Sequence, residues 1–334
     1  MKLITPDLHD FMSPEDVEGH VFSPNNFREE TLNWIENRNK KSGCKIPCLK
    51  DTDLRIIPGT LSVWAGVNGH GKSALIQQFC LWWADGKYTD KDEKILFWSP
   101  EMAFHVQIER MVKQALGVSE PTTQAASFIM DYLEGKVFIY GKEEHVRASE
   151  IIALARWAAA NEFTHLVIDS LMMVDLQTDQ ANLNLGQKSF VRTLKEAART
   201  TGLHIHLVAH MRKSETETRM GDKMDIKGTG DISDLADYAF LIWKDTRKQE
   251  KLYSDPDDEE WLRKPDGYLK CIKNRYDPEH PCLALWFSGK PFSFKDGRRA
   301  PTPRLVEPSK EDMESSLAKD QERYNGGYVP GEAE

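Results

Sequence analysis

The chain has 334 residues, of which 40% are hydrophobic and 29% are charged, and this balance excludes a wholly disordered chain or a collagen-like one. Its 53 acidic and 44 basic side chains give a formal net charge of −9, which argues against a protein that simply coats DNA but allows a local basic channel. No apolar run approaches the roughly 18 residues of a membrane span, and the acidic N-terminus lacks the apolar stretch of a signal peptide. We therefore expect a soluble, intracellular protein with no membrane partner.

Residues 1–57 are predicted to form an N-terminal arm and linker. They are polar and contain the helix breakers Pro6, Pro14 and Pro24. One helical pattern stands out at about 26–38. The arm could fold on its own core or dock on a neighbouring subunit, and the sequence leaves both interpretations open.

The cysteines do not predict a disulfide framework. Five cysteines in 334 residues are too few for one, and their odd number suits a reducing compartment. Cys44 and Cys48 have a spacing that could supply half of a zinc site. No second cysteine pair stands at a ligand spacing, so we do not predict zinc from the sequence.

Residues 58–300 are predicted to form one α/β domain. Strand and helix patterns alternate along it, the strands at 61–65, 95–99, 137–140, 166–169 and 203–209, the helices at 72–85, 104–116, 148–161 and 185–201. This alternation is typical of a mostly parallel sheet flanked by helices. Little helix separates three later strand patterns, at 238–243, 269–272 and 283–287. They predict an antiparallel extension at one edge of the sheet.

Two long polar segments, 211–229 and 245–267, are predicted to be loops. Long loops in a compact domain are usually functional or mobile. Helical and strand periodicity is lost after about residue 300. Residues 303–334 hold eight acidic and four basic side chains, so we predict a flexible acidic tail at 301–334.

The residues Gly-Val-Asn-Gly-His-Gly-Lys-Ser at 66–73 match the G-x-x-x-x-G-K-[ST] phosphate loop, and they stand between a predicted strand and a predicted helix. The glycines let backbone N–H groups turn towards phosphate oxygens, and the helix N-terminus adds partial positive charge. Lys72 is predicted to reach the β- and γ-phosphates of ATP or another NTP, and the Ser73 hydroxyl to ligate Mg²⁺. The predicted nucleotide-binding residues of this loop are Gly66, Asn68, Gly69, His70, Gly71, Lys72, Ser73 and Ala74.

Two carboxylates stand at the ends of predicted strands. Asp169 ends the run His-Leu-Val-Ile-Asp, and at the carboxyl end of a parallel strand it would face the phosphate loop and hold the Mg²⁺ shell. Glu101 stands just past the strand predicted at 95–99, where a general base could hold a water beside the γ-phosphorus. It could equally stabilise the following helix through the helix dipole, and the residues alone favour neither role.

Three histidines, His204, His206 and His210, fall on one face of a predicted strand by their spacing. We do not predict a metal site there, because no cluster of cysteine or aspartate accompanies them in the sequence. His210 stands at the end of the strand, where it could sense the γ-phosphate and pass its state to the 211–229 loop.

Basic residues gather at two further places. The 211–229 loop carries Arg212, Lys213, Arg219, Lys223 and Lys227 against four acidic residues. Its net charge of +1 is weak for a nucleic-acid patch and also fits a solvated loop. Lys273 and Arg275 lie on one side of a late strand. They are either exposed surface charges or the pair that a ring neighbour offers to the γ-phosphate.

Assembled, these residues resemble the RecA-like ATPase domain of ring-shaped replicative DNA helicases of the DnaB-like group (superfamily 4), which includes phage primase–helicases and the mitochondrial replicative helicase. The likeness spans roughly 58–287. It rests on the GxxxxGKS loop, the S-x-E-M segment at 99–102, the V-I-D-S strand at 167–170 and the V-A-H strand end at 208–210. The segment 226–243 and the K-x-R strand at 273–275 also resemble that group.

The resemblance implies a RecA-like P-loop NTPase core and a homo-hexameric, Mg²⁺-dependent helicase that translocates on single-stranded DNA and unwinds duplex. It implies Glu101 as catalytic base, His210 as γ-phosphate sensor, and Arg275 with Lys273 as fingers acting in trans. It also implies that 211–229 lines a central channel holding single-stranded DNA. We expect a cytoplasmic location in a bacterial cell or a phage-infected host, with a separate primase, polymerase or loader as partner.

Two other functions fit the same residues. A RecA-like recombination or repair ATPase would form filaments, and a non-translocating helicase loader or assembly factor would use nucleotide to hold a protein partner. Electron microscopy separates closed rings from filaments, and strand displacement argues against a loader.

Overall fold

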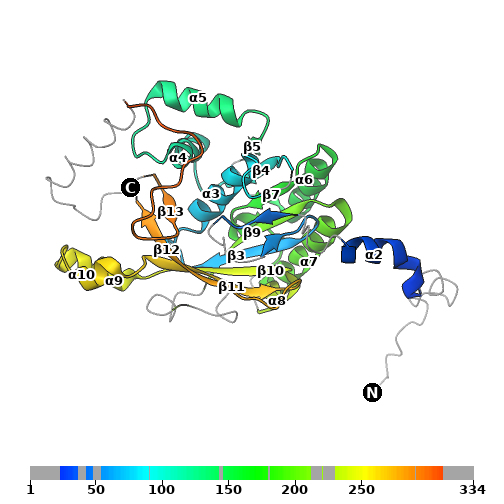
Figure 1. Ribbon diagram of the computed structural model, residues 1–334. Coiled ribbons are helices and arrows are strands. Elements are labelled where there is room, and N and C mark those ends of the chain that lie inside the picture. Colours follow the sequence, from blue (N-terminus) through cyan, green and yellow to red (C-terminus); the bar gives the residue numbers. More distant parts are fainter. Residues whose placement is uncertain are drawn as a thin grey trace, which may run out of the picture. The chain divides into compact units, whose positions relative to one another are not determined.

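The computed structural model describes residues 23–36, 43–47, 54–89, 91–142, 146–179, 181–211, 220, 230–289 and 291–310. The chain divides into two compact units, Met1–Lys41 and Ser42–Glu334. The first contains the 3-10 helix η2 (Pro24–Phe27) and the helix α2 (Arg28–Glu36), in agreement with the helix predicted at about 26–38. The other elements named below belong to the second unit (Figure 1).

A nine-stranded sheet forms the centre of the second unit, in the order β13-β12-β11-β10-β3-β9-β7-β4-β5. Its parallel part consists of β10 (Tyr238–Lys244), β3 (Leu61–Gly66), β9 (His204–His210), β7 (His165–Ile168), β4 (Ile95–Trp98) and β5 (Val137–Ile139). Antiparallel pairing adds β11 (Gly267–Asn274), β12 (Cys282–Ser288) and β13 (Ser293–Lys295). The predicted parallel α/β sheet with an antiparallel extension is therefore confirmed.

Both faces of the parallel strands are covered, which explains why these strands read as continuous apolar runs in the sequence. Every residue of β3, β4, β7 and β9 is buried. Successive side chains of β3 point to opposite faces. Leu61, Val63 and Ala65 join one hydrophobic cluster, whereas Trp64 joins the other. The sheet therefore separates two cores, one for each helical layer.

The helices lie in two layers. One layer consists of α3 (Lys72–Ala84), α4 (Phe104–Leu116) and α5 (Thr123–Leu133), whose buried residues pack in the core of Trp64. The other consists of α6 (Ala148–Ala160) and α7 (Leu183–Thr201), which pack in the core of Val63. None of the described helices is both long and apolar enough to cross a membrane.

The direction of the strands fixes where functional groups can meet. Because β3, β4, β7 and β9 are parallel neighbours, they all end at one edge of the sheet, where ligands bind in open α/β folds. We call this edge the carboxyl edge, and the edge where these strands begin the amino edge. The phosphate loop follows β3 and therefore lies at the carboxyl edge.

The segment 245–267, predicted to be a loop, forms two helices, α9 (Thr246–Ser254) and α10 (Glu259–Arg263). The loop prediction is wrong because two polar residues of this segment, Asp245 and Asp258, are helix caps. Asp245 accepts a hydrogen bond from a backbone N–H at the start of α9, and Asp258 does the same for α10. Each such cap stabilises a helix by about 0.5–2 kcal/mol.

Several short elements have no clear pattern in the sequence. They are the antiparallel pair β1 (Cys44–Lys45) and β2 (Arg55–Ile56), the parallel pair β6 (Val146–Arg147) and β8 (Val174–Asp175), the 3-10 helix η3 (Leu171–Met173) and the helix α8 (Gly230–Leu235). Two-residue pairings of this kind depend on partners far away in the chain, so the alternation within one segment does not reveal them.

Part of the segment predicted as an acidic tail lies against the core. The backbone N–H groups of Leu305 and Val306 both donate to the carbonyl oxygen of Ala115 in α4. Both side chains pack on the core formed by α3, α4 and α5. Residues 311–334 lie outside the described residues.

Replacing Trp64 by alanine should lower the free energy of unfolding by about 3–5 kcal/mol, because a buried aromatic ring leaves a cavity. Trp64 is fully buried, and its ring centroid stacks 4.3 Å from that of Phe240. Trp157→Ala is the matched control, since the side chain of Trp157 is 53% exposed. Urea unfolding of both variants measures the difference, and equal losses would contradict the assignment of Trp64 to the core.

Candidate nucleotide-binding site

The phosphate loop connects β3 to α3, as the motif predicts. Gly69 and Gly71 have φ angles of 79° and 85°, a left-handed conformation that glycine adopts without strain. Packing also demands glycine. A Cβ atom at Gly71 would lie 2.6 Å from Cζ of Phe294, and one at Gly66 would lie 2.4 Å from the carbonyl oxygen of Ile242. The shape of the loop therefore depends on these glycines.

Phe294 of β13, which lies beside Gly71 of the phosphate loop, is held in place by a side chain of α3. Nε2 of Gln78 donates to the carbonyl oxygen of Phe294 over 3.0 Å, and Oε1 accepts the N–H of Phe294 over 2.7 Å. Gly71 is the N-cap of α3 and provides no side-chain capping bond. The N–H groups of the first turn of α3 are therefore suited to bind an anion such as phosphate.

Lys72 is buried in the loop that it follows. Its Nζ donates to the carbonyl oxygen of Val67 over 3.1 Å. Burial lowers the pKa of Lys72 to about 8, and the nearby carboxylates of Asp169 and Glu101 act in the opposite direction. An anion beside this amine would stabilise its charged form.

Asp169 directly follows β7 and is brought to the phosphate loop, as predicted. Ser73 forms a side-chain hydrogen bond with Asp169, and the Ser99 hydroxyl donates to Oδ2 of Asp169 over 3.2 Å. Burial raises the pKa of Asp169, and the hydrogen bond from Ser73 opposes this rise. The hydroxyl of Ser73 and the carboxylate of Asp169 are hard oxygen donors, so they fit the ligand preference of Mg²⁺.

Glu101 forms a hydrogen-bonded group with Ser170 and His210 at the carboxyl edge. The Ser170 hydroxyl donates to Oε1 of Glu101 over 2.5 Å and lies 3.1 Å from Nε2 of His210. Nε2 of His210 is 3.5 Å from the same carboxylate oxygen. The hydrogen bond from His210 lowers the pKa of Glu101, with a further contribution from Ser170. Glu101 stands two residues before Ala103, the N-cap of α4, and therefore lies outside the first turn of that helix.

His70 connects the phosphate loop to β10. Its Nδ1 accepts the backbone N–H of Lys244 over 3.2 Å. Burial lowers the pKa of His70 to about 4, and the charges of Lys72 and Lys244 lower it further. The ring is therefore neutral near pH 7, and it acts in this structure as a hydrogen-bond acceptor that fixes the loop.

Lys273 and Arg275 lie at the amino edge, away from the phosphate loop. They stand at the end of β11, which is antiparallel to β10 and pairs there with Tyr238, the first residue of β10. Nζ of Lys273 donates to two backbone carbonyl oxygens at the end of α8, over 2.9 and 2.5 Å. Nε of Arg275 lies 3.0 Å from Oδ1 of Asp237. The structure therefore brings neither side chain to the nucleotide site of its own subunit.

The other candidates separate into two groups. His204 and His206 are buried in the half of β9 that begins at the amino edge, apart from His210. The five basic residues of the predicted DNA loop lie outside the described residues, namely Arg212, Lys213, Arg219, Lys223 and Lys227. Their DNA-binding role stays a prediction.

The sequence analysis assigns no role to three further residues of the site, although Ser99 and Ser170 belong to the S-x-E-M and V-I-D-S segments. Ser99 and Ser170 each stand just past the carboxyl end of a strand, which is the signal that could have found them. Arg110 on α4 carries no such signal. Burial lowers its pKa, whereas the charge of Asp169 raises it, and its guanidinium carbon lies 4.7 Å from the ring centroid of Phe292. Each of the three residues therefore interacts with a carboxylate at the carboxyl edge, Ser99 and Arg110 with Asp169 and Ser170 with Glu101.

The strand, glycine loop and helix, with a buried carboxylate at the end of a second parallel strand of the sheet, define a P-loop nucleotide-binding protein of RecA-like fold. A family model described as an AAA domain matches residues 28–216. This match covers more than half of the chain, so the chain belongs to that family. No curated protein sequence matches the chain.

Solved structures show the same fold. A structure described as an ATPase domain matches with a TM-score of 0.66 at 15% identity, over 81% of this chain and 98% of that chain. The structure of a DnaB-like replicative helicase, described with its interactions with primase, matches with a TM-score of 0.64 at 16% identity, over 82% of this chain and 67% of that chain. At these identities the likeness establishes the fold, and it confirms the predicted resemblance to DnaB-like ATPase domains at that level.

Nucleotide affinity should fall as the pH rises from 7 to 9.5, because Lys72 has a pKa of about 8 and binds phosphate in its charged form. One pH unit above that pKa about a tenth of the lysine stays charged, so at pH 9 binding should be about tenfold weaker than at pH 7. Titration with a fluorescent ATP analogue measures this. Lys72→Arg should show no such slope, since a guanidinium stays charged across the range. A parent profile as flat as that of the variant would refute the buried-lysine explanation.

Proposed function

We propose that the chain is an NTP-driven DNA helicase that translocates on single-stranded DNA as a ring. The observation that carries this proposal is the hydrogen-bonded group of Glu101, Ser170 and His210. The group connects the position of a catalytic base to the residue before the 211–229 loop, the predicted DNA-binding segment. The likeness of the fold to a solved ATPase domain and to a DnaB-like replicative helicase supports it.

In the proposed reaction, the backbone of the phosphate loop and Lys72 bind the β- and γ-phosphates. Ser73 and Asp169 would hold Mg²⁺, which neutralises charge that develops on the phosphate oxygens. Glu101 holds the attacking water and accepts its proton. Its lowered pKa keeps the carboxylate ionised and ready to accept a proton at neutral pH.

Ser170 and His210 orient Glu101, and His210 also connects hydrolysis to movement. Nδ1 of His210 is buried and has no hydrogen-bond partner among the described residues, so it is open to a contact that changes with the γ-phosphate. Met211, the next residue, donates its backbone N–H to the carbonyl oxygen of Gly66 over 3.2 Å. A change at the γ-phosphate would therefore reach the start of the predicted DNA loop by two routes, through His210 and through the hydrogen bond between Met211 and Gly66.

The positions of Lys273 and Arg275 support hydrolysis between subunits. They lie at the amino edge of their own sheet, and the side chain of Arg275 is 47% exposed. An arginine that reaches the γ-phosphate of a neighbouring subunit would act there as a finger that stabilises the transition state. Repetition of this contact would close a homo-hexameric ring with the predicted DNA loops towards its centre.

The helicase proposal predicts nucleotide-dependent strand displacement on a forked duplex. Parent protein with Mg²⁺ and ATP, or another NTP, should release the labelled strand from a forked duplex. Forks with a 5′ tail and forks with a 3′ tail are tested separately, because translocation has one direction. Glu101→Gln should bind a fluorescent ATP analogue normally and lose displacement by at least about 10²-fold, because the base is lost. Glu109→Gln on the exposed side of α4, with that side chain 56% exposed, is the matched control and should keep activity.

Other outcomes of this experiment select the alternatives. DNA-stimulated hydrolysis without displacement, together with filaments in electron micrographs, would indicate a recombination or repair ATPase. Nucleotide binding with no effect of DNA would indicate a loader or assembly factor.

Arg275→Ala should bind nucleotide normally and hydrolyse it about 10³-fold more slowly if Arg275 acts on a neighbouring subunit. Mixing it with the inactive Lys72→Ala variant should restore activity, because some interfaces then pair an intact phosphate loop with an intact Arg275. Phosphate release across mixing ratios measures this, with single-stranded DNA present and subunit exchange confirmed. Arg263→Ala, whose side chain is 73% exposed, controls for loss of surface charge. Mixtures that never exceed their two parents would refute action in trans.

A further inference from the structure

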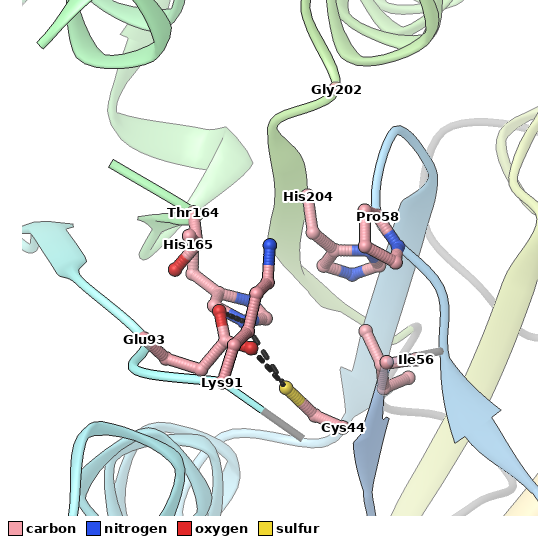
Figure 2. A pocket seen from close by; sticks show the side chains of 10 residues that line it. Cys44, Ile56, Pro58, Lys91, Glu93, Thr164, His165, Gly202 and His204 are labelled. Atoms are coloured by element: carbon pink, nitrogen blue, oxygen red, sulfur yellow. Dashed lines mark hydrogen bonds and ion pairs between the residues drawn. The ribbon is translucent and has the colours of Figure 1, made fainter. Parts of the chain in front are cut away.

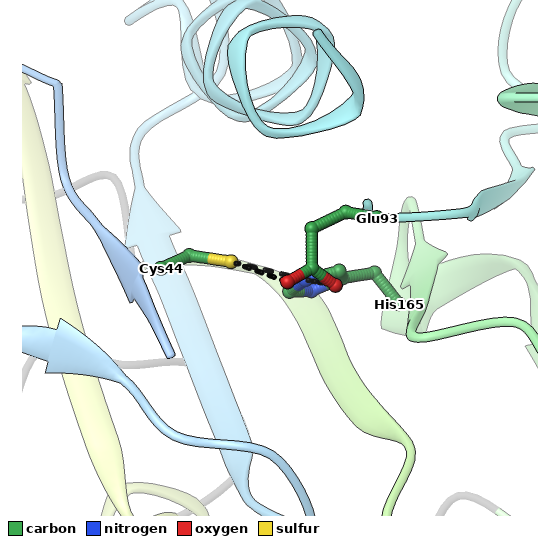
Figure 3. Close-up of side chains that lie close together, drawn as sticks. All are labelled: Cys44, Glu93 and His165. Atoms are coloured by element: carbon green, nitrogen blue, oxygen red, sulfur yellow. Dashed lines mark hydrogen bonds and ion pairs between the residues drawn. The ribbon is translucent and has the colours of Figure 1, made fainter. Parts of the chain in front are cut away.

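A second group of polar side chains is buried at the amino edge, opposite the nucleotide site. Cys44 in β1, Glu93 before β4 and His165 at the start of β7 come together there (Figure 3). All three line one pocket, which is also lined by Lys91 and His204 (Figure 2). None of them takes part in the nucleotide chemistry described above.

The ligand-type atoms of the three residues lie at similar distances from one another. Sγ of Cys44 is 3.5 Å from Oε1 of Glu93 and 3.4 Å from Nε2 of His165. Nε2 of His165 is 3.4 Å from Oε2 of Glu93. The last distance is longer than the about 2.7–3.2 Å of an ordinary N–H···O hydrogen bond. The three side chains therefore bring one sulfur, one imidazole nitrogen and one carboxylate together in a single buried group.

We propose that Cys44, Glu93 and His165 bind a zinc ion. Tetrahedral Zn²⁺ with bonds of about 2.3 Å to sulfur and about 2.0–2.2 Å to nitrogen and oxygen has ligand–ligand edges of about 3.4–3.6 Å. Two separations have this length, from Sγ of Cys44 to Nε2 of His165 and from Sγ of Cys44 to Oε1 of Glu93, and Nε2 of His165 lies 3.4 Å from the other carboxylate oxygen, Oε2. One thiolate, one imidazole and one carboxylate form a donor set that suits zinc and is too soft for Mg²⁺.

The surroundings of His165 match those of a metal-bound histidine. Such a ring usually uses its second nitrogen for a hydrogen bond that fixes its orientation. Nδ1 of His165 lies 3.0 Å from Nε2 of His206, and Nδ1 of His206 lies 2.9 Å from the Ser62 hydroxyl. Stacking adds to this constraint, since the Trp83 ring centroid lies 5.3 Å from that of His165. Nε2 of His165 is thereby directed at Cys44 and Glu93.

Because all three proposed ligands line the pocket, a water there can complete the coordination. Lys91 lines the same pocket, and its charge opposes a cation. The negative charges of a Cys44 thiolate and the Glu93 carboxylate outnumber it. Zinc at this point would tie β1 to the starts of β4 and β7 and so fix the segment that leads into the ATPase core.

Zinc titration of the full-length protein, stripped with a chelator under reducing conditions, tests the proposal. In competition with a chromophoric zinc chelator, the parent should take up one equivalent of Zn²⁺. Cys44→Ser, Glu93→Gln and His165→Gln should each bind at least about 100-fold more weakly, and His206→Gln about 10–100-fold more weakly, as expected for an outer-shell partner. Added Zn²⁺ should raise the Tm of the parent and not that of Cys44→Ser.

Two controls make the result decisive. Cys282→Ser removes an exposed thiol elsewhere and should leave zinc binding unchanged. Binding of a fluorescent ATP analogue at the opposite edge shows that each variant is folded. Stoichiometric zinc in the parent that is lost in the folded ligand variants supports the site. A parent that takes up no zinc, or a Cys44→Ser variant that keeps the parent's affinity, would overturn it and leave a packed polar cluster.

Discussion

The close approach of the phosphate-loop backbone to its neighbours is the constraint on which the nucleotide site depends. A single added methyl group at Gly66 or Gly71 would collide with β10 or with the ring of Phe294. This lack of space fixes the path of the loop, in which Lys72 is buried and donates to the carbonyl oxygen of Val67. The same tight packing lowers the pKa of Lys72 and raises that of Asp169. Lys72 is therefore suited to the negative charge of a phosphate ligand, and Asp169 to the cation that such a ligand brings.

Much of the fold follows from the sequence because a parallel sheet covered on both faces needs continuous apolar strands. The runs that became β3, β4, β7 and β9 could be read directly for this reason. The helices α9 and α10 could not, because Asp245 and Asp258 occur both in loops and as N-caps. β13 depends on the amide of Gln78, a partner more than two hundred residues away, and no local pattern shows such a contact.

The residues of the site also divide into those that a local sequence pattern predicts and those that depend on distant partners. The motif located Gly66 to Ala74, and the strand pattern located Asp169, because both signals are local. The residues alone left a base and a helix-end role open for Glu101, and its contacts with Ser170 and His210, which support the base role, join distant segments that no local pattern connects. The cluster of Cys44, Glu93 and His165 stayed hidden because its members are separated by 49 and 121 positions, whereas metal-ligand spacing in a sequence is recognised over a few residues.

The carboxylate of Asp237 has a further consequence. Its Oδ1 lies 3.0 Å from Nε of Arg275 and 2.9 Å from Nζ of Lys195, and its Oδ2 accepts the N–H of Leu61. A buried carboxylate that loses its sole cation is strongly destabilised. If Arg275 turned outward, Asp237 would still be paired with Lys195, so its buried carboxylate would not be left without a cation. In the proposed action on a neighbouring subunit, Arg275 would thus be an exchangeable counter-ion, and its departure would not unfold the strand edge that carries it.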